Sequence, residues 1–158
     1  MQILLKLVLD CSADAAWDAV RSPRGMQQVS APLTTFESLE PGGFPPTWSA
    51  GEHTVRISSF GGVTVGDQVI GISYPEREDD VRMQVDTGRG LSGPLALVTK
   101  WQHSIAIAPA PHGRTLYRDQ LVFEAGALTP LLWLGYWAFW QWRGARIRAL
   151  APSWEAHA

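Results

Sequence analysis

The chain has little cysteine and no excess of positive charge, and each shortage excludes a class of protein. A single cysteine, Cys11, cannot close an internal disulfide bond, and no Cys/His cluster has the spacing of a metal site. We therefore expect a protein of the reduced cytoplasm that needs no metal ion and no other cofactor. The 13 Lys and Arg residues are outnumbered by 15 Asp and Glu residues, which gives a net charge of −2. A nucleic-acid partner is not expected, because no surplus cations are available to neutralise phosphates.

Long hydrophobic runs are also scarce. Residues 1–11 are interrupted by Lys6 and carry apolar residues at every second position, which indicates a strand rather than a signal peptide. Residues 130–140 are apolar apart from one glycine, but this run is shorter than the ~18 residues needed to cross a bilayer. We expect no transmembrane segment, and peripheral contact with a membrane stays an open alternative.

The length of 158 residues suits a single domain, which we place at residues 1–150, with a short tail at 151–158. Ser12 is a suitable N-cap for a short helix over 13–20, and residues 21–32 read as a second short helix or turn. Six further runs have strand composition and are separated by Gly- and Pro-rich turns: 33–40, 53–60, 63–74, 81–87, 97–108 and 115–124. Together with the N-terminal strand they predict seven strands in a mainly antiparallel sheet.

The most unusual segment is the predicted helix over 130–150, which is rich in tryptophan. Two aromatic stripes run along it at helical spacing: Trp133, Trp137 and Trp140, and beside them Tyr136, Phe139 and Arg143. One stripe should cover the sheet. Four explanations stay open for the other stripe: further core packing, the lining of a cavity, a dimer contact or insertion at a membrane surface.

The motifs near the C-terminus carry a family resemblance. In order they are Gly93-Pro94, a strand with Trp101-x-His103, a Gly113-x-Thr115 hairpin, a strand with Asp119, and the aromatic helix ending in Arg143 and Arg146. With this order the chain resembles the START-like or SRPBCC superfamily, and within it the bacterial polyketide cyclase/dehydrase-like proteins. The resemblance implies an α+β helix-grip fold. In that fold two short helices follow the first strand, and a seven-stranded antiparallel sheet wraps around a long C-terminal helix with a hydrophobic cavity between them. It implies a fold better than an activity.

His103 and Asp119 are the candidate catalytic residues. If the hairpin pairs Ile107 with Thr115, antiparallel counting places His103 opposite Asp119, with both side chains pointing inward. The pair could then act in proton transfer, or the two side chains could simply satisfy each other in the core.

We expect the chain to bind, and so to carry or sense, a small hydrophobic molecule of aromatic or lipid-like character. The expected contacts are Trp101, His103, Tyr117, Asp119, Trp133 and Trp137. One alternative is a cyclase/dehydrase-type enzyme in which His103 and Asp119 move protons on a polyketide-like substrate. The other is a non-catalytic module that forms a homodimer or touches a membrane through the aromatic helix. The sequence leaves open whether any reaction is catalysed.

Overall fold

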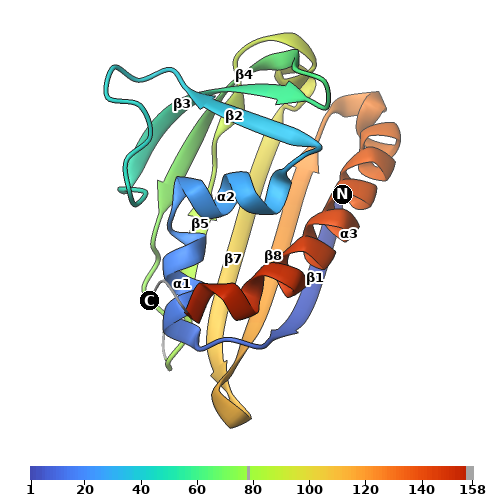
Figure 1. Ribbon diagram of the computed structural model, residues 1–158. Helices are drawn as coiled ribbons and strands as arrows, with labels where there is room; N and C mark the ends of the chain where they lie inside the picture. The colour runs from blue at the N-terminus through green and yellow to red at the C-terminus, as the bar shows by residue number, and fades with distance from the viewer. Residues whose placement is uncertain (78, 156–158) are drawn as a thin grey trace.

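One curved antiparallel sheet carries three helices on the same face (Figure 1). The computed structural model describes residues 1–77 and 79–155, so residues 156–158 of the expected tail lie outside the described part. The strands are β1 (Gln2–Leu9), β2 (Thr34–Ser38), β3 (Gly51–Ser59), β4 (Val63–Ser73), β5 (Arg82–Asp86), β6 (Arg89–Gly90), β7 (Lys100–Ala110) and β8 (Arg114–Glu124). Their order in the sheet is β1-β8-β7-β5-β4-β3-β2, and β6 pairs with β4 beside this path. The α+β class and the antiparallel sheet of the prediction are confirmed.

One face of the sheet is buried because buried and exposed side chains alternate along its long strands. Every second side chain of β1 and of β8 is buried, so both strands present one face to the helices and the other to solvent. The strand expected over 97–108 begins later, at Lys100. The residues before it form a short 3-10 helix, η1 (Gly93–Leu97).

The two short helices, α1 (Ala13–Val20) and α2 (Pro23–Ser30), begin where the sequence predicts. The Ser12 side chain accepts a hydrogen bond from the backbone N–H of Ala15 at 3.2 Å, which caps α1. The C-terminal helix, α3 (Thr129–Trp154), is longer than expected and continues four residues past Leu150. Ala151 and Trp154 are buried on this last turn, so the end of α3 belongs to the core.

The pairing of β7 with β8 corrects the expected register. His103 lies opposite Leu121, and Asp119 lies opposite Ile105, so the true register is shifted by two residues from the predicted one. The cause is the hairpin: β7 continues to Ala110, and the connection over Pro111–Gly113 includes His112 with a positive φ of 65°. A shift of two residues keeps every side chain on its face. His103 and Asp119 therefore still point inward, as diagonal neighbours.

Three apolar clusters surround the space between the sheet and the helices. The first joins α1, β1 and the end of α3 around Leu9, Ile107 and Ile147. The second joins the first half of α3 to the sheet around Phe123 and Trp140. The third lies on β3 and β4 and holds the buried Trp48 of the preceding loop, together with other side chains that include Val55 and Ile70. None of the described helices is long and apolar enough to cross a membrane.

Candidate functional site

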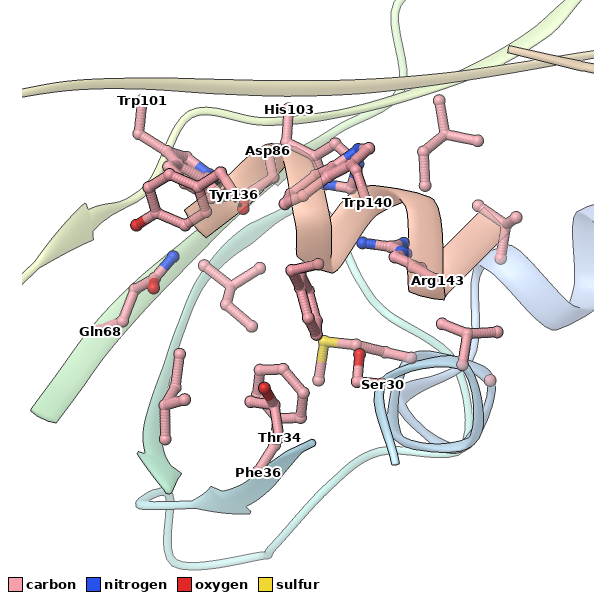
Figure 2. Close-up of a pocket in the computed structure, with 18 of the residues that line it drawn as sticks. Ser30, Thr34, Phe36, Gln68, Asp86, Trp101, His103, Tyr136, Trp140 and Arg143 are labelled. Atoms are coloured by element: carbon pink, nitrogen blue, oxygen red, sulfur yellow. Dashed lines mark hydrogen bonds between the residues drawn. The ribbon is translucent and has the colours of Figure 1, made fainter. Parts of the chain in front are cut away.

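A cavity of about 610 Å³ lies between the inner face of the sheet, α2 and α3. Figure 2 shows Trp101, His103, Tyr136, Trp140 and Arg143 along one side, with Ser30, Thr34 and Phe36 opposite. Most of the remaining wall is aliphatic and comes from all three clusters, including Val29, Ile57, Ile70, Ile72, Ile105 and Ile147. The cavity thus combines a large apolar surface with a few polar side chains, of which the ionisable His103 and Arg143 lie on the same side, and this is the usual composition of a small-molecule site.

The polar side is organised by Asp119, whose side chain is fully buried behind the cavity wall. Its carboxylate accepts hydrogen bonds from His103 Nε2 at 2.8 Å, Trp140 Nε1 at 2.8 Å and the Tyr117 hydroxyl at 3.1 Å. The Arg143 guanidinium lies 3.7 Å from the second carboxylate oxygen. One buried charge therefore positions side chains from β7, β8 and α3.

The protonation of this group follows from its partners. Burial on its own would raise the pKa of the Asp119 carboxyl, but His103 and Arg143 and the hydrogen bonds from His103 and Trp140 outweigh it. Together they hold that pKa well below its usual range. Burial, reinforced by the adjacent Asp119 charge, raises the pKa of the Tyr117 hydroxyl well above its usual range. Asp119 is therefore an anion at neutral pH, and Tyr117 is a neutral hydrogen-bond donor.

The anionic state of Asp119 assigns the tautomer of His103. An ionised carboxylate can only accept, so His103 Nε2 carries a proton. Among the residues that the structure describes, none bonds the other ring nitrogen, Nδ1, and the His103 side chain lines the cavity. In the neutral imidazole, Nδ1 therefore offers a lone pair to whatever the cavity holds.

Arg143 supplies the opposite function, a donor, on α3. Its guanidinium stacks over the Trp140 ring at 5.5 Å and lines the cavity, and only 11% of its side chain is exposed. Within the described part of the chain, its buried Nε has no hydrogen-bond partner. The cavity thus presents His103 Nδ1, which accepts when the imidazole is neutral, and a buried cationic donor on Arg143, and both side chains are anchored on Asp119.

A second buried carboxylate, Asp86 at the end of β5, lies in the cavity wall. It accepts hydrogen bonds from the backbone N–H groups of Gly71 at 2.8 Å and Gly88 at 2.9 Å, and from Trp101 Nε1 at 3.0 Å. Trp101 is thereby held against Tyr136 of α3, with a ring separation of 5.6 Å. Asp86 fixes one aromatic part of the wall.

The structure places the six expected contact residues in two groups. Trp101, His103 and Tyr117 line the cavity, and Asp119 lies directly behind them. Trp133 and Trp137 lie outside the wall. The Trp133 indole donates to the backbone oxygen of Gln2 at 3.0 Å, and the exposed Trp137 stacks on Trp133.

The wall is formed instead by the second stripe of α3. Tyr136, Phe139 and Arg143 line the cavity together with Trp140 of the first stripe. On the side of the helix that packs on the sheet, Gly144 lies close to β1: a Cβ at this position would lie 3.2 Å from Leu5 Cδ1. The side of α3 that includes Gly144 and Trp140 is therefore pressed against the sheet.

The sequence reasoning did not identify Asp86, Gln84 or Trp48. Gln84 and Asp86 are both buried on β5 and both line the cavity, and the Gln84 side-chain oxygen has no partner among the described residues. Their period-two spacing in the 81–87 run was the available signal. Trp48 lies in an irregular loop, where no periodic pattern marks it as buried.

Comparison with known proteins bears on the fold. No family model and no curated protein matches the chain. Among solved structures, a protein of Chromobacterium violaceum is similar over 95% of this chain and 96% of its own, with 18% identity and a TM-score of 0.64. A hypothetical protein of Helicobacter pylori matches over 96% of this chain and 88% of its own, with 9% identity and a TM-score of 0.69.

A third solved structure is a Thalictrum norcoclaurine synthase point mutant in complex with a transition-state analogue. It matches over 97% of this chain and 94% of its own, with 16% identity and a TM-score of 0.62. At these identities the likeness concerns the fold alone. The sheet with its long C-terminal helix is consistent with a helix-grip fold, and so are these neighbours. Such a fold is compatible with ligand binding.

Proposed function

We propose that this chain is a member of the SRPBCC superfamily that carries or senses one small hydrophobic molecule held in the cavity. The observation that carries the proposal is the cavity itself, about 610 Å³ between sheet and helices. This volume lies within the roughly 300–1,000 Å³ of typical ligand sites. A ligand that buries about 200–300 Å² of apolar surface would gain roughly 5–8 kcal/mol before the cost of immobilisation.

The wall chemistry favours a flat or ring-containing ligand with one polar, uncharged end. Trp101, Tyr136, Phe139 and Trp140 offer ring faces and edges to such a molecule. The Asp119 charge already balances that of Arg143, so a second anion would bring an excess negative charge into a buried place. A hydroxyl at His103 Nδ1 or a carbonyl at Arg143 fits without this cost.

The second candidate function is catalysis of the cyclase/dehydrase kind, and the orientation of His103 favours it. His103 Nδ1 would remove a proton from a carbon next to a ligand carbonyl, Arg143 would stabilise the resulting enolate oxygen, and Asp119 would stabilise the imidazolium. The proton would return from His103 to the product. Binding of the ligand comes first in both cases.

The experiment is native mass spectrometry of the purified protein, followed by extraction of any bound compound and titration with the uncharged fluorescent probe N-phenyl-1-naphthylamine. Gly135 lines the cavity, and a Cβ added there meets no atom within 4 Å. Gly135→Leu should therefore block part of the cavity without a clash and weaken uptake of the probe. Gly135→Ala is the matched control, because it makes the same backbone change and fills little space.

The outcomes separate the candidates. A stoichiometric apolar compound, or probe uptake lost in Gly135→Leu and kept in Gly135→Ala, supports binding in this cavity. A protein that is empty and takes up no probe contradicts it. Catalysis further requires that a bound carbonyl compound is converted, and that His103→Gln stops conversion while the compound still binds.

A further inference from the structure

Three segments far apart in the sequence lie together at one end of the molecule, and each contributes to the cavity wall, through Ser59, Leu95 and Leu131. The segments are the β3–β4 hairpin (57–66), the stretch around η1 (90–99) and the start of α3 with its approach (125–142), and Figure 1 shows all three at the top. A Cβ on Gly66 would lie 2.2 Å from the Ser92 carbonyl oxygen, so the first two segments touch. Val98 and Leu132 belong to one apolar cluster, which joins the second segment to the third. We call these three segments the rim.

The rim exposes large apolar side chains to solvent. Phe60 is 71% exposed, Leu131 67% and Leu134 59%. The other exposed apolar side chains of the rim are Val63, Leu91, Leu97, Leu128, Trp137 and Trp142. Clusters of this kind on a chain with few hydrophobic runs mark a surface that is covered in use.

The rim also carries no charge. None of its three segments contains Asp, Glu, Lys or Arg. The charged residues that flank the segments are each paired within the protein: Arg56 with Asp67 at 2.9 Å, Arg89 with Glu52 at 2.7 Å, Lys100 with Glu124 at 3.0 Å and Arg143 with Asp119 at 3.7 Å. The rim is therefore an uncharged apolar surface bordered by neutralised charges.

We propose that the rim docks on the surface of a lipid bilayer. Leu131 on α3 lines the cavity although 67% of it is exposed, so the cavity reaches the surface at the rim and a bilayer seated here would face it. An apolar molecule could then pass between bilayer and cavity without crossing water. The exposed Trp137 and Trp142 are of the residue type that settles at the boundary between lipid and water. A protein partner would usually be met by charged groups around the apolar centre, and here the flanking charged residues are already paired within the protein.

Because the rim carries no charge, its docking should depend little on lipid charge and on salt. Basic surfaces bind anionic lipids and release them at high salt, whereas an apolar surface binds by the area it buries. We expect binding to vesicles of pure phosphatidylcholine that is insensitive to salt and gains little from added phosphatidylserine.

The test is co-sedimentation of the full chain with phosphatidylcholine vesicles. The rim variant is Phe60→Glu/Leu134→Glu, and the matched control is Leu4→Glu/Leu116→Glu, which replaces two exposed apolar residues of β1 and β8 on the sheet face turned away from the helices. These four residues lie outside the cavity wall, so uptake of N-phenyl-1-naphthylamine should stay unchanged in both variants. The rim variant should lose about tenfold in partitioning for each side chain replaced, and the control should bind like the unmodified chain.

Several results would overturn the proposal: no binding to phosphatidylcholine, binding only to anionic vesicles, or equal losses in the rim variant and the control. It would also be overturned if light scattering shows a dimer that dissociates in the rim variant and persists in the control, because the rim would then be an interface between copies. If the double variant folds poorly, the vesicle assay is repeated with the single variant Phe60→Glu, which changes only the β3–β4 hairpin.

The vesicle assay needs no ligand. Loss of vesicle binding and loss of ligand binding in the cavity can therefore be observed independently of each other.

Discussion

The two buried carboxylates of the cavity region, Asp119 and Asp86, are held in opposite ways. Asp86 is held mainly by backbone, through the N–H groups of Gly71 and Gly88, with one indole added. Asp119 is held entirely by side chains, those of His103, Tyr117, Trp140 and Arg143. The first fixes the path of the chain between β4, β5 and β6. The second determines where donors and acceptors lie around the cavity.

From this difference we expect Asp86 to stabilise the fold and Asp119 to matter for ligand binding. Backbone amides cannot move toward a ligand, so Asp86 serves as a fixed support for Trp101. The partners of Asp119 mostly face the cavity, so removing its charge would disturb a ligand's surroundings on several sides at once. The predictions below test this contrast, beginning with the largest expected effect.

Asp119→Asn should be the most damaging single change. It leaves the Arg143 charge buried without an anion and gives His103 and Trp140 a weaker acceptor. Removing one partner of a buried pair costs about 3–5 kcal/mol. Urea unfolding should show this loss, together with weakened probe uptake. A loss below that of Asp86→Asn would contradict the role assigned to Asp119.

The same residue should make stability depend on acid. The pKa of Asp119 is lower in the folded chain than its ordinary value of ~3.9. Its stabilising contribution is therefore fully present above that ordinary value and declines as the pH falls below it. The unmodified chain should exceed Asp119→Asn in unfolding free energy at about pH 6, and this difference should be smaller at about pH 3. A constant difference would show that the charge of Asp119 does not stabilise the fold.

Asp86→Asn should cost about 1–3 kcal/mol. The amide oxygen can still accept from Gly71 and Gly88, but an NH2 group would then face the Trp101 indole N–H. We expect urea unfolding to show the loss, and the NMR signal of the Trp101 indole proton to move while that of Trp140 stays. Movement of both signals would mean that the two carboxylates act as one network.

Tyr117→Phe should have the smallest effect, about 1 kcal/mol. It removes one 3.1 Å hydrogen bond and leaves the ring in the core, while Asp119 keeps its other partners. Thermal unfolding measures the change. A loss as large as that of Asp119→Asn would mean that the hydroxyl, rather than the positive charges, stabilises the carboxylate.

The sequence predicted most of the architecture because the relevant signals are local. Alternation along 115–124 identified the inner face of β8, and Ser12 marked the start of α1. The register of β7 against β8 could not be predicted, since it depends on where the hairpin turns, and His112 takes up a left-handed conformation that its sequence does not require.

The candidate site was predicted in part for the same reason. The faces of β7 and β8 follow from alternation, so the inward placement of Trp101, His103, Tyr117 and Asp119 could be predicted, while their contact with a ligand stays a prediction. Which stripe of α3 lines the cavity depends on the rotation of the helix, and that depends on packing between segments far apart in the sequence, such as Gly144 of α3 and Leu5 of β1. Asp86 was missed because its importance arises from Gly71, Gly88 and Trp101, which only the folded sheet brings to it.

The positions of the tryptophans have a practical consequence. Four of the eight, Trp48, Trp101, Trp140 and Trp154, line the cavity, and Trp101 and Trp140 each donate an indole N–H to a buried carboxylate. Indole emission depends on the polarity and packing around the ring. Filling or emptying the cavity should therefore change the colour and brightness of the protein's own fluorescence, and unlabelled protein can report its occupancy in real time.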